Sequence, residues 1–138
     1  MAVTGIEGIV LLVGRILFGG VLAFMGLNHF MQTDGMVGYA QHKGLPAPKL
    51  SVLGSGAILV LGGLSVALGV FPVLGAAAVA AFLLVSAVLM HDFWAVPEDQ
   101  QQDEMTQFLK NAAMAGGALV VAVLAGETWA FSVGLGLF

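Results

Sequence analysis

Residues 6–31 read IEGIVLLVGRILFGGVLAFMGLNHFM, and this stretch decides the fold. All of its residues are apolar or glycine except Glu7, Arg15, Asn28 and His29. A helix needs about 20 mostly apolar residues to cross the hydrocarbon core of a bilayer. The residues before Arg15 include no basic side chain, and the apolar run is too long for the core of a signal peptide. The sequence therefore predicts a retained membrane-spanning helix.

Three further stretches have the same character, and they cover residues 50–70, 73–94 and 105–126. The first of these has no charge, the next has none before His91 and Asp92, and the last carries Lys110 near its start. We therefore expect a single transmembrane domain over residues 1–138. Its fold class is all-α, a four-helix bundle that passes several times through the cell membrane.

The composition leads to the same conclusion. Hydrophobic residues make up 59% of the chain and charged residues 9%, whereas soluble domains carry about 25% charged residues. Lipid is therefore the expected solvent for most of the surface. The net charge of −4 gives no basis for nucleic-acid binding. Because the chain has no cysteine, it cannot supply a disulfide, a thiolate metal site or a thiol relay.

The connections set the topology. Gly69 and Pro72 indicate a tight turn between the second and third spans. Residues 32–49 form a longer connection, in which we expect a short helix over residues 34–42 capped by Asp34. We expect the acidic residues 97–104 to be a polar loop. An even number of spans places these two connections on one side of the membrane, the loop side, and both ends of the chain on the other, the termini side.

Aromatic and basic residues near the span ends support this arrangement. The lysines lie toward the loop side, which favours a cytoplasmic loop side. We expect the tail after Gly126 to lie at the membrane interface. Trp94, Trp129 and Tyr39 fit the aromatic belt that membrane proteins place at this depth.

The first and third spans run in the same direction, so their C-terminal ends share a depth. Asn28 and His29 should therefore lie near His91 and Asp92, with Lys110 entering from the same side and with Tyr39 and His42 on the loop above them. Ionisable groups within a membrane are functional candidates by default. The structural alternatives are a histidine at a helix C-terminus and an ion pair of Asp92 with Lys110 or a histidine. Adjacent residues point about 100° apart on a helix, so we expect no metal site.

Arg15 is the most diagnostic residue because it lies deep in the first span. It shares one helical face with Gly19, Gly26 and, less closely, His29. That face should point into the bundle, since arginine on the lipid side is costly. Arg15 either reaches toward Glu7 or Glu127 at the termini side or donates hydrogen bonds to a carbonyl or anion inside the bundle.

Three segments resemble the DoxX family of small membrane proteins: Gly14-Arg15-Ile16-Leu17-Phe18-Gly19-Gly20, Asn28-His29-Phe30 and His91-Asp92-Phe93-Trp94. The resemblance covers nearly the whole chain and implies a four-helix bundle. The family is named for a subunit of a thiosulfate:quinone oxidoreductase, so membrane redox roles are implied. Any sulfur chemistry would need a partner subunit or direct reduction of a quinone. The similarity of residues 27–30 to residues 90–93 also suggests two repeated helical hairpins.

Three hypotheses follow. In the first, the chain is a redox-associated subunit that binds a quinone and no covalent cofactor. His29 or His91 would donate a hydrogen bond to a quinone oxygen, and Asp92 would orient a histidine or carry its proton. Trp94 and Phe93 would pack against the ring. In the second, it is a non-catalytic anchor for a partner redox enzyme, which docks on residues 32–49 and 97–104. The glycine-rich helix faces also permit a homo-oligomer. In the third, it is a transporter or channel subunit that uses Arg15 as an anion site.

Overall fold

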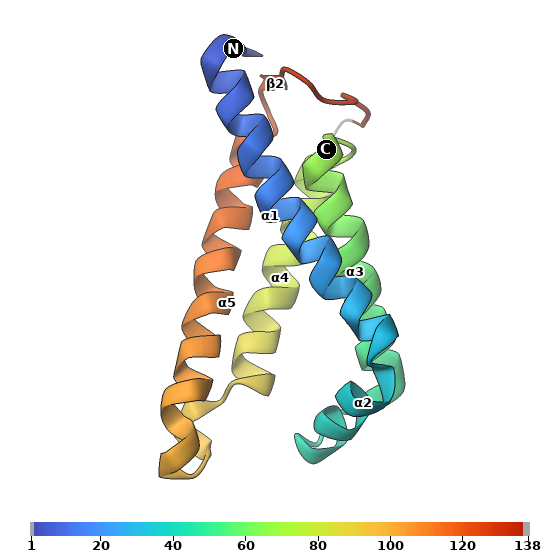
Figure 1. Ribbon diagram of the computed structural model, residues 1–138, viewed down its shortest axis with the longest axis vertical. Helices are drawn as coiled ribbons and strands as arrows, with labels where there is room; N and C mark the ends of the chain where they lie inside the picture. The colour runs from blue at the N-terminus through green and yellow to red at the C-terminus, as the bar shows by residue number, and fades with distance from the viewer. Residues whose placement is uncertain (1, 137–138) are drawn as a thin grey trace.

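Four long helices stand side by side in the computed structural model, which describes residues 2–136 (Figure 1). In chain order the elements are β1 (Ala2–Val3), α1 (Gly5–Met31), α2 (Thr33–His42), α3 (Pro48–Leu68), α4 (Pro72–Met90), the single-turn helix η1 (Phe93–Ala95), α5 (Glu98–Leu124) and β2 (Thr128–Trp129). The helices α1, α3, α4 and α5 are long and apolar enough to cross a membrane. The all-α, four-helix prediction is confirmed.

The fourth helix begins earlier than the hydropathy suggests. Helix α5 starts at Glu98, and residues 98–104 form its first two turns, so the prediction of a polar loop at residues 97–104 was wrong. Pro97 occupies the position before the helix, and neither glycine nor proline follows it before Gly116. The carboxylates of Glu98 and Asp99 lie in the first turn, where they interact favourably with the positive end of the helix dipole.

The short surface helix is present as α2, but its start differs from the prediction. Asp34 does not cap the helix, because Gln32 is the residue before it and Asp34 lies in the first turn. The Thr33 hydroxyl donates to His29 O at 2.8 Å and to Phe30 O at 3.0 Å. These bonds use carbonyl groups that the end of α1 leaves unpaired, so Gln32 alone forms the corner between α1 and α2.

The turn between α3 and α4 agrees with the prediction. Gly69 ends α3 with a positive φ of 71°, and Pro72 opens α4. The Ser65 hydroxyl donates to Val70 O at 2.6 Å and to Phe71 O at 2.9 Å. The turn is therefore tight, because its carbonyl groups are bonded to a side chain of the preceding helix.

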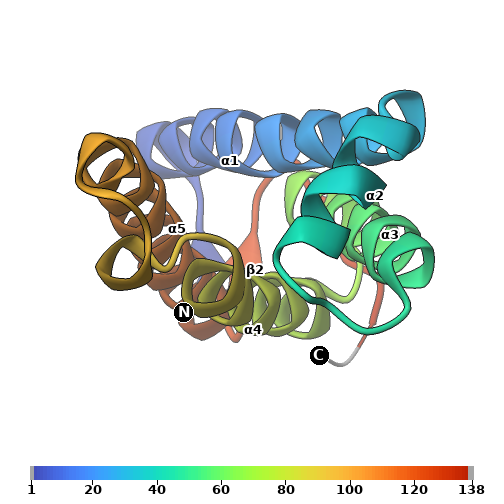
Figure 2. The same ribbon diagram turned by 90° about the horizontal axis from the view of Figure 1, so that it is seen from below.

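Helix α1 packs on α3, α3 packs on α4, and α4 packs on α5. Helices α1 and α5 make little contact with each other. Seen from below, α1 and α4 lie on opposite sides of the bundle, with α3 and α5 completing it (Figure 2). The buried core draws on all four helices and includes Leu22, Leu59, Val79, Leu83, Ala115 and Ala118. Glycines let α1 approach α3 at backbone distance, as at Gly19 against Gly63 and at Gly26 against Gly56.

The C-terminal segment is folded against the ends of the helices. Residues 127–136 fold back across the termini side and form what we call the termini-side cap (Figure 1). Strand β2 pairs in parallel with β1, and Val133 N donates to Leu68 O at 2.8 Å. Trp129 is only 7% exposed, and its indole N–H donates to Leu124 O at 2.7 Å. The aromatic-belt prediction was therefore wrong for Trp129, whose polar atom is satisfied inside the protein.

Candidate functional site

A group of polar side chains ties α2 to α4 and α5 at the loop side. His91 caps the C-terminus of α4, and its Nδ1 lies 2.8 Å from Glu104 Oε2 on α5. The Tyr39 hydroxyl of α2 donates to Glu104 Oε1 at 3.2 Å and to Met90 O at 3.0 Å. Because an ionised carboxylate only accepts hydrogen bonds, Glu104 requires the proton of His91 to sit on Nδ1. Glu104 thus fixes both the orientation and the tautomer of the imidazole.

A lysine that the sequence reasoning did not single out completes this group. Lys43 Nζ lies 2.5 Å from Asp92 Oδ1, and the lysine side chain is only 11% exposed. The ammonium also lies 5.8 Å from the centroid of the Tyr39 ring, within the range of a cation–π contact. We call Tyr39, Lys43, His91, Asp92 and Glu104 the loop-side network.

The structural alternative in which Asp92 pairs with Lys110 or a histidine was wrong, because Asp92 pairs with Lys43 and His91 pairs with Glu104. Lys110 is exposed on the surface of α5. The early start of α5 at Glu98 places Lys110 about three turns into the helix rather than one. The loop after α2 brings Lys43 to Asp92 instead.

The surroundings of Lys43 keep it protonated. Burial lowers the pKa of its ammonium, but the hydrogen bond to Asp92 and the neighbouring Tyr39 and Glu104 outweigh burial, so the pKa is raised above the usual lysine value. A lysine with a raised pKa stabilises the folded state fully below the ordinary lysine pKa and loses that contribution as the pH rises through the raised pKa. The ion pair is therefore complete at neutral pH.

This ion pair gives a testable prediction for α2. Lys43→Met should raise the rate of amide hydrogen exchange across α2 about tenfold, which corresponds to about 1.4 kcal/mol of local stability. Hydrogen exchange with mass spectrometry on the detergent-solubilised protein measures this directly. Lys49→Met is the matched control, because Lys49 is exposed in the first turn of α3. Equal exchange in the two variants would show that the pair does not hold α2.

The second histidine of the sequence analysis lies in a different environment. His29 Nδ1 lies 3.1 Å from Val52 O and 3.0 Å from Ser55 Oγ, both on α3. Since a carbonyl only accepts, Nδ1 of His29 also carries the proton. Asn28 is half-buried beside it. His29 and His91 share the loop side, but no hydrogen bond within residues 2–136 joins them, and each is bonded to the helix packed against its own.

An aromatic cluster adjoins the loop-side network. The rings of Phe93, Trp94 and Phe108 meet edge to face, with centroids 5.2, 5.5 and 5.9 Å apart. Trp94 is 56% exposed, as the aromatic-belt prediction requires. Of the two residues expected to cover this region, Tyr39 reaches it and His42 is exposed. Across the described residues, no group of three histidine or carboxylate side chains is placed to hold a metal ion.

Arg15 belongs to the other side of the membrane. Its side chain is buried, with 1% exposure, and its Nη2 donates to Phe131 O at 2.7 Å and to Ala67 O at 3.2 Å. The guanidinium lies 5.0 Å from the centre of the Trp129 ring. Arg15 thus binds carbonyl oxygens of α3 and of the termini-side cap. It lies about 21 Å along α1 from His29 and takes no part in the loop-side network.

Comparison with known proteins adds a family and one relative. A family model described as DoxX matches residues 10–92, more than half of the chain. The inner membrane protein YphA of Escherichia coli (strain K12) is 29% identical over 115 residues, which cover 83% of this chain and 82% of that protein. No solved structure matches. With the four apolar helices, these matches show a multi-pass membrane protein. The matched range includes Arg15, His29 and His91 but ends before Glu104.

Proposed function

The chain belongs to the DoxX family, and from this premise we propose that it is a redox-associated membrane subunit with a quinone headgroup site at the loop side. One observation carries the proposal. Glu104 holds His91 through Nδ1, while Nε2 has no hydrogen-bond partner within residues 2–136. A carboxylate-oriented imidazole with an available second nitrogen is a suitable group for proton exchange with a ligand.

The chemistry of a quinone headgroup fits this position. Its two oxygens need hydrogen-bond partners that release or take up protons as the ring is reduced or oxidised. Neutral His91 would accept a hydroxyl proton of the hydroquinone at Nε2, and the imidazolium would donate to a quinone oxygen. Trp94 and Phe93 offer flat apolar surfaces beside His91, and the bilayer would take the isoprenoid tail. The ion pair of Asp92 with Lys43 would determine the electrostatic potential at the headgroup.

The proposal uses one histidine rather than two. His29 Nδ1 is held by Val52 O and Ser55 Oγ, and this arrangement is sufficient to explain a polar side chain at the end of α1. We therefore assign His29 a role in joining α1 to α3, and we leave both His29 and Asn28 outside the headgroup site.

Quinone binding to the purified protein in nanodiscs tests this assignment. We expect saturable binding of a short-chain ubiquinone or menaquinone, weakened about tenfold or more by His91→Ala, the size of one lost hydrogen bond to a charged group. His29→Ala and His42→Ala should retain binding, the latter as the exposed control. No saturable binding to the wild-type protein, or equal loss in all three variants with the fold intact, would contradict the proposal.

A second candidate function is a non-catalytic anchor for a partner enzyme. The observation in its favour is the exposed polar face of the first turns of α5, which carries Glu98, Asp99 and Asp103. Under this alternative, Asp99→Lys with Asp103→Lys would abolish co-purification of the partner enzyme, because both substitutions reverse the charge of the docking face. His91→Ala would leave co-purification unchanged. The opposite pattern would favour the quinone site.

A further inference from the structure

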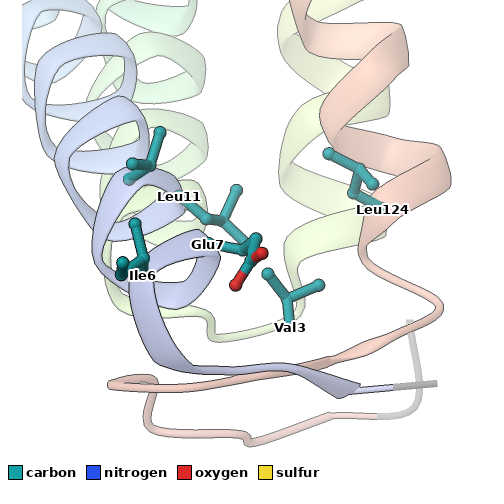
Figure 3. A pocket seen from close by; sticks show the side chains of 6 residues that line it. Val3, Ile6, Glu7, Leu11 and Leu124 are labelled. Atoms are coloured by element: carbon teal, nitrogen blue, oxygen red, sulfur yellow. The ribbon is translucent and has the colours of Figure 1, made fainter.

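A groove opens between α1 and α5 at the termini side, where the two helices are not packed closely together (Figure 3). Its volume is about 330 Å³, and its lining consists of Val3, Ile6, Glu7, Val10, Leu11 and Leu124. Five of these six side chains are aliphatic. The groove is therefore an apolar slot with one carboxylate. It is separate from the loop-side network.

Glu7 lines this groove, and its side chain is exposed. Figure 3 shows its carboxylate among the aliphatic side chains of α1, between them and Val3 and Leu124 of the opposite wall. Glu7 is in the first turn of α1, where the helix dipole favours a negative charge. Arg15 donates through Nη2 to Ala67 O and Phe131 O, and no ion pair within residues 2–136 joins it to Glu7. The inside of the groove is therefore apolar, and its carboxylate lies at the exposed edge.

The groove also faces the lipid. Exposed apolar side chains adjoin it on the outer surfaces of both helices, namely Ile9 and Val13 of α1 and Val123 of α5. Both helices are long enough to cross the membrane. The walls of an apolar groove at a bilayer gain dispersion contacts from an apolar group bound between them. A lipid acyl chain is the apolar group at hand to fill it, and its headgroup would then lie at the termini-side interface, near the first turn of α1.

We propose that this groove is a binding site for phosphatidylethanolamine, with an acyl chain between α1 and α5 and the headgroup ammonium on Glu7. The primary ammonium supplies three N–H donors to the carboxylate, and such charge-assisted bonds are strong. The trimethylammonium of phosphatidylcholine has the charge but no N–H. Phosphatidylglycerol carries the same phosphate as the other two lipids but no positive group, so nothing in its headgroup offsets the repulsion between the phosphate and Glu7. The site therefore selects among lipids by the number of donors and by charge.

Native mass spectrometry after exchange into micelles with equal amounts of the three lipids tests the proposal. We expect the wild-type protein to retain phosphatidylethanolamine about fivefold over each of the others, the order of one charge-assisted contact near a membrane surface. Glu7→Gln should bring phosphatidylethanolamine to parity with phosphatidylcholine. Glu98→Gln, which removes an exposed carboxylate at the loop side, should leave the preference unchanged.

A second variant separates the chain site from the headgroup contact. Leu124→Trp fills the groove from α5 and should reduce the retention of all three lipids, with thermal unfolding as the check on folding. Equal retention of the three lipids by the wild-type protein would overturn the proposal. A preference that survives Glu7→Gln, or a preference for phosphatidylglycerol, would overturn it as well.

Discussion

Gly19→Ala should destabilise the protein by about 3 kcal/mol, the upper end of what overpacking costs in a core, whereas Gly20→Ala should be silent. At residue 19 the added methyl group would meet Gly63 O at less than contact distance and would lie 2.9 Å from Ala67 N. Both are backbone atoms of α3, so neither can rotate away. At residue 20 nothing lies within 4 Å of the added methyl group.

The thermal unfolding of the two variants in one detergent, followed by circular dichroism, measures this difference. The comparison is well matched because the two glycines are adjacent in α1 and undergo the same chemical change. Alanine has the higher helix propensity, so any loss in Gly19→Ala must come from packing. Equal unfolding temperatures would mean that α1 and α3 separate enough to accept a methyl group, and that their close approach does not stabilise the bundle.

The reason for so large an effect lies in the solvent. Lipid tails are as apolar as leucine, so burial of apolar surface does not drive helices together inside a membrane. Association depends on close contact, and Gly63 and Gly19 supply it reciprocally, each lying against the backbone of the other helix. Gly26 against Gly56 repeats the contact two turns further along. A methyl group at residue 19 therefore removes what holds the two helices in register.

The four spans could be predicted from the sequence because lipid imposes a simple rule of length and polarity. The same rule explains the error at α5. Hydropathy reports which residues lie in the hydrocarbon, not which residues are helical, so it placed the start near residue 105 although the helix begins at Glu98. The termini-side cap was missed for a different reason. A parallel pair of two-residue strands, β1 and β2, is too short to show any periodic pattern.

The candidate site was predicted only in part. Topology correctly placed His91 and Asp92 at the loop side, because the direction of each span fixes the depth of its ends. Depth does not fix which neighbour a side chain faces. The partners Lys43 and Glu104 depend on how α2 folds back and on the extra turns of α5, and both are set by tertiary packing. Glu104 could have been recognised as the partner of His91 only if residues 98–104 had been assigned to a helix.

Arg15→Gln should release the termini-side cap. The guanidinium bonds two segments that are far apart in the sequence, at Ala67 O and Phe131 O, and Trp129 lies over it. Glutamine is too short to reach both carbonyl oxygens and carries no charge for the indole ring. We expect the free energy of unfolding to fall by about 2–4 kcal/mol, since two buried carbonyl oxygens lose hydrogen bonds to a charged group.

Tryptophan fluorescence reports on this release directly. The chain has two tryptophans, so Trp94→Phe leaves Trp129 as the sole emitter. In that background Arg15→Gln should shift the emission to longer wavelength, because Trp129 moves from a site of 7% exposure toward water. Arg15→Lys should shift it less, since an ammonium keeps the charge and one of the two bonds. An unchanged spectrum in Arg15→Gln would show that strand pairing alone holds the cap.

The cap has reason to depend on Arg15. Phe131, whose carbonyl receives the shorter of the two bonds, has a positive φ of 55°, a conformation that costs a residue with a side chain about 1–2 kcal/mol. Two-residue strands contribute few hydrogen bonds to offset that cost. The buried charge in turn depends on the cap, because the Phe131 carbonyl and the Trp129 ring replace part of its hydration. Arg15 and the cap should therefore be lost together, which is why a substitution inside α1 should expose a tryptophan more than 100 residues later in the chain.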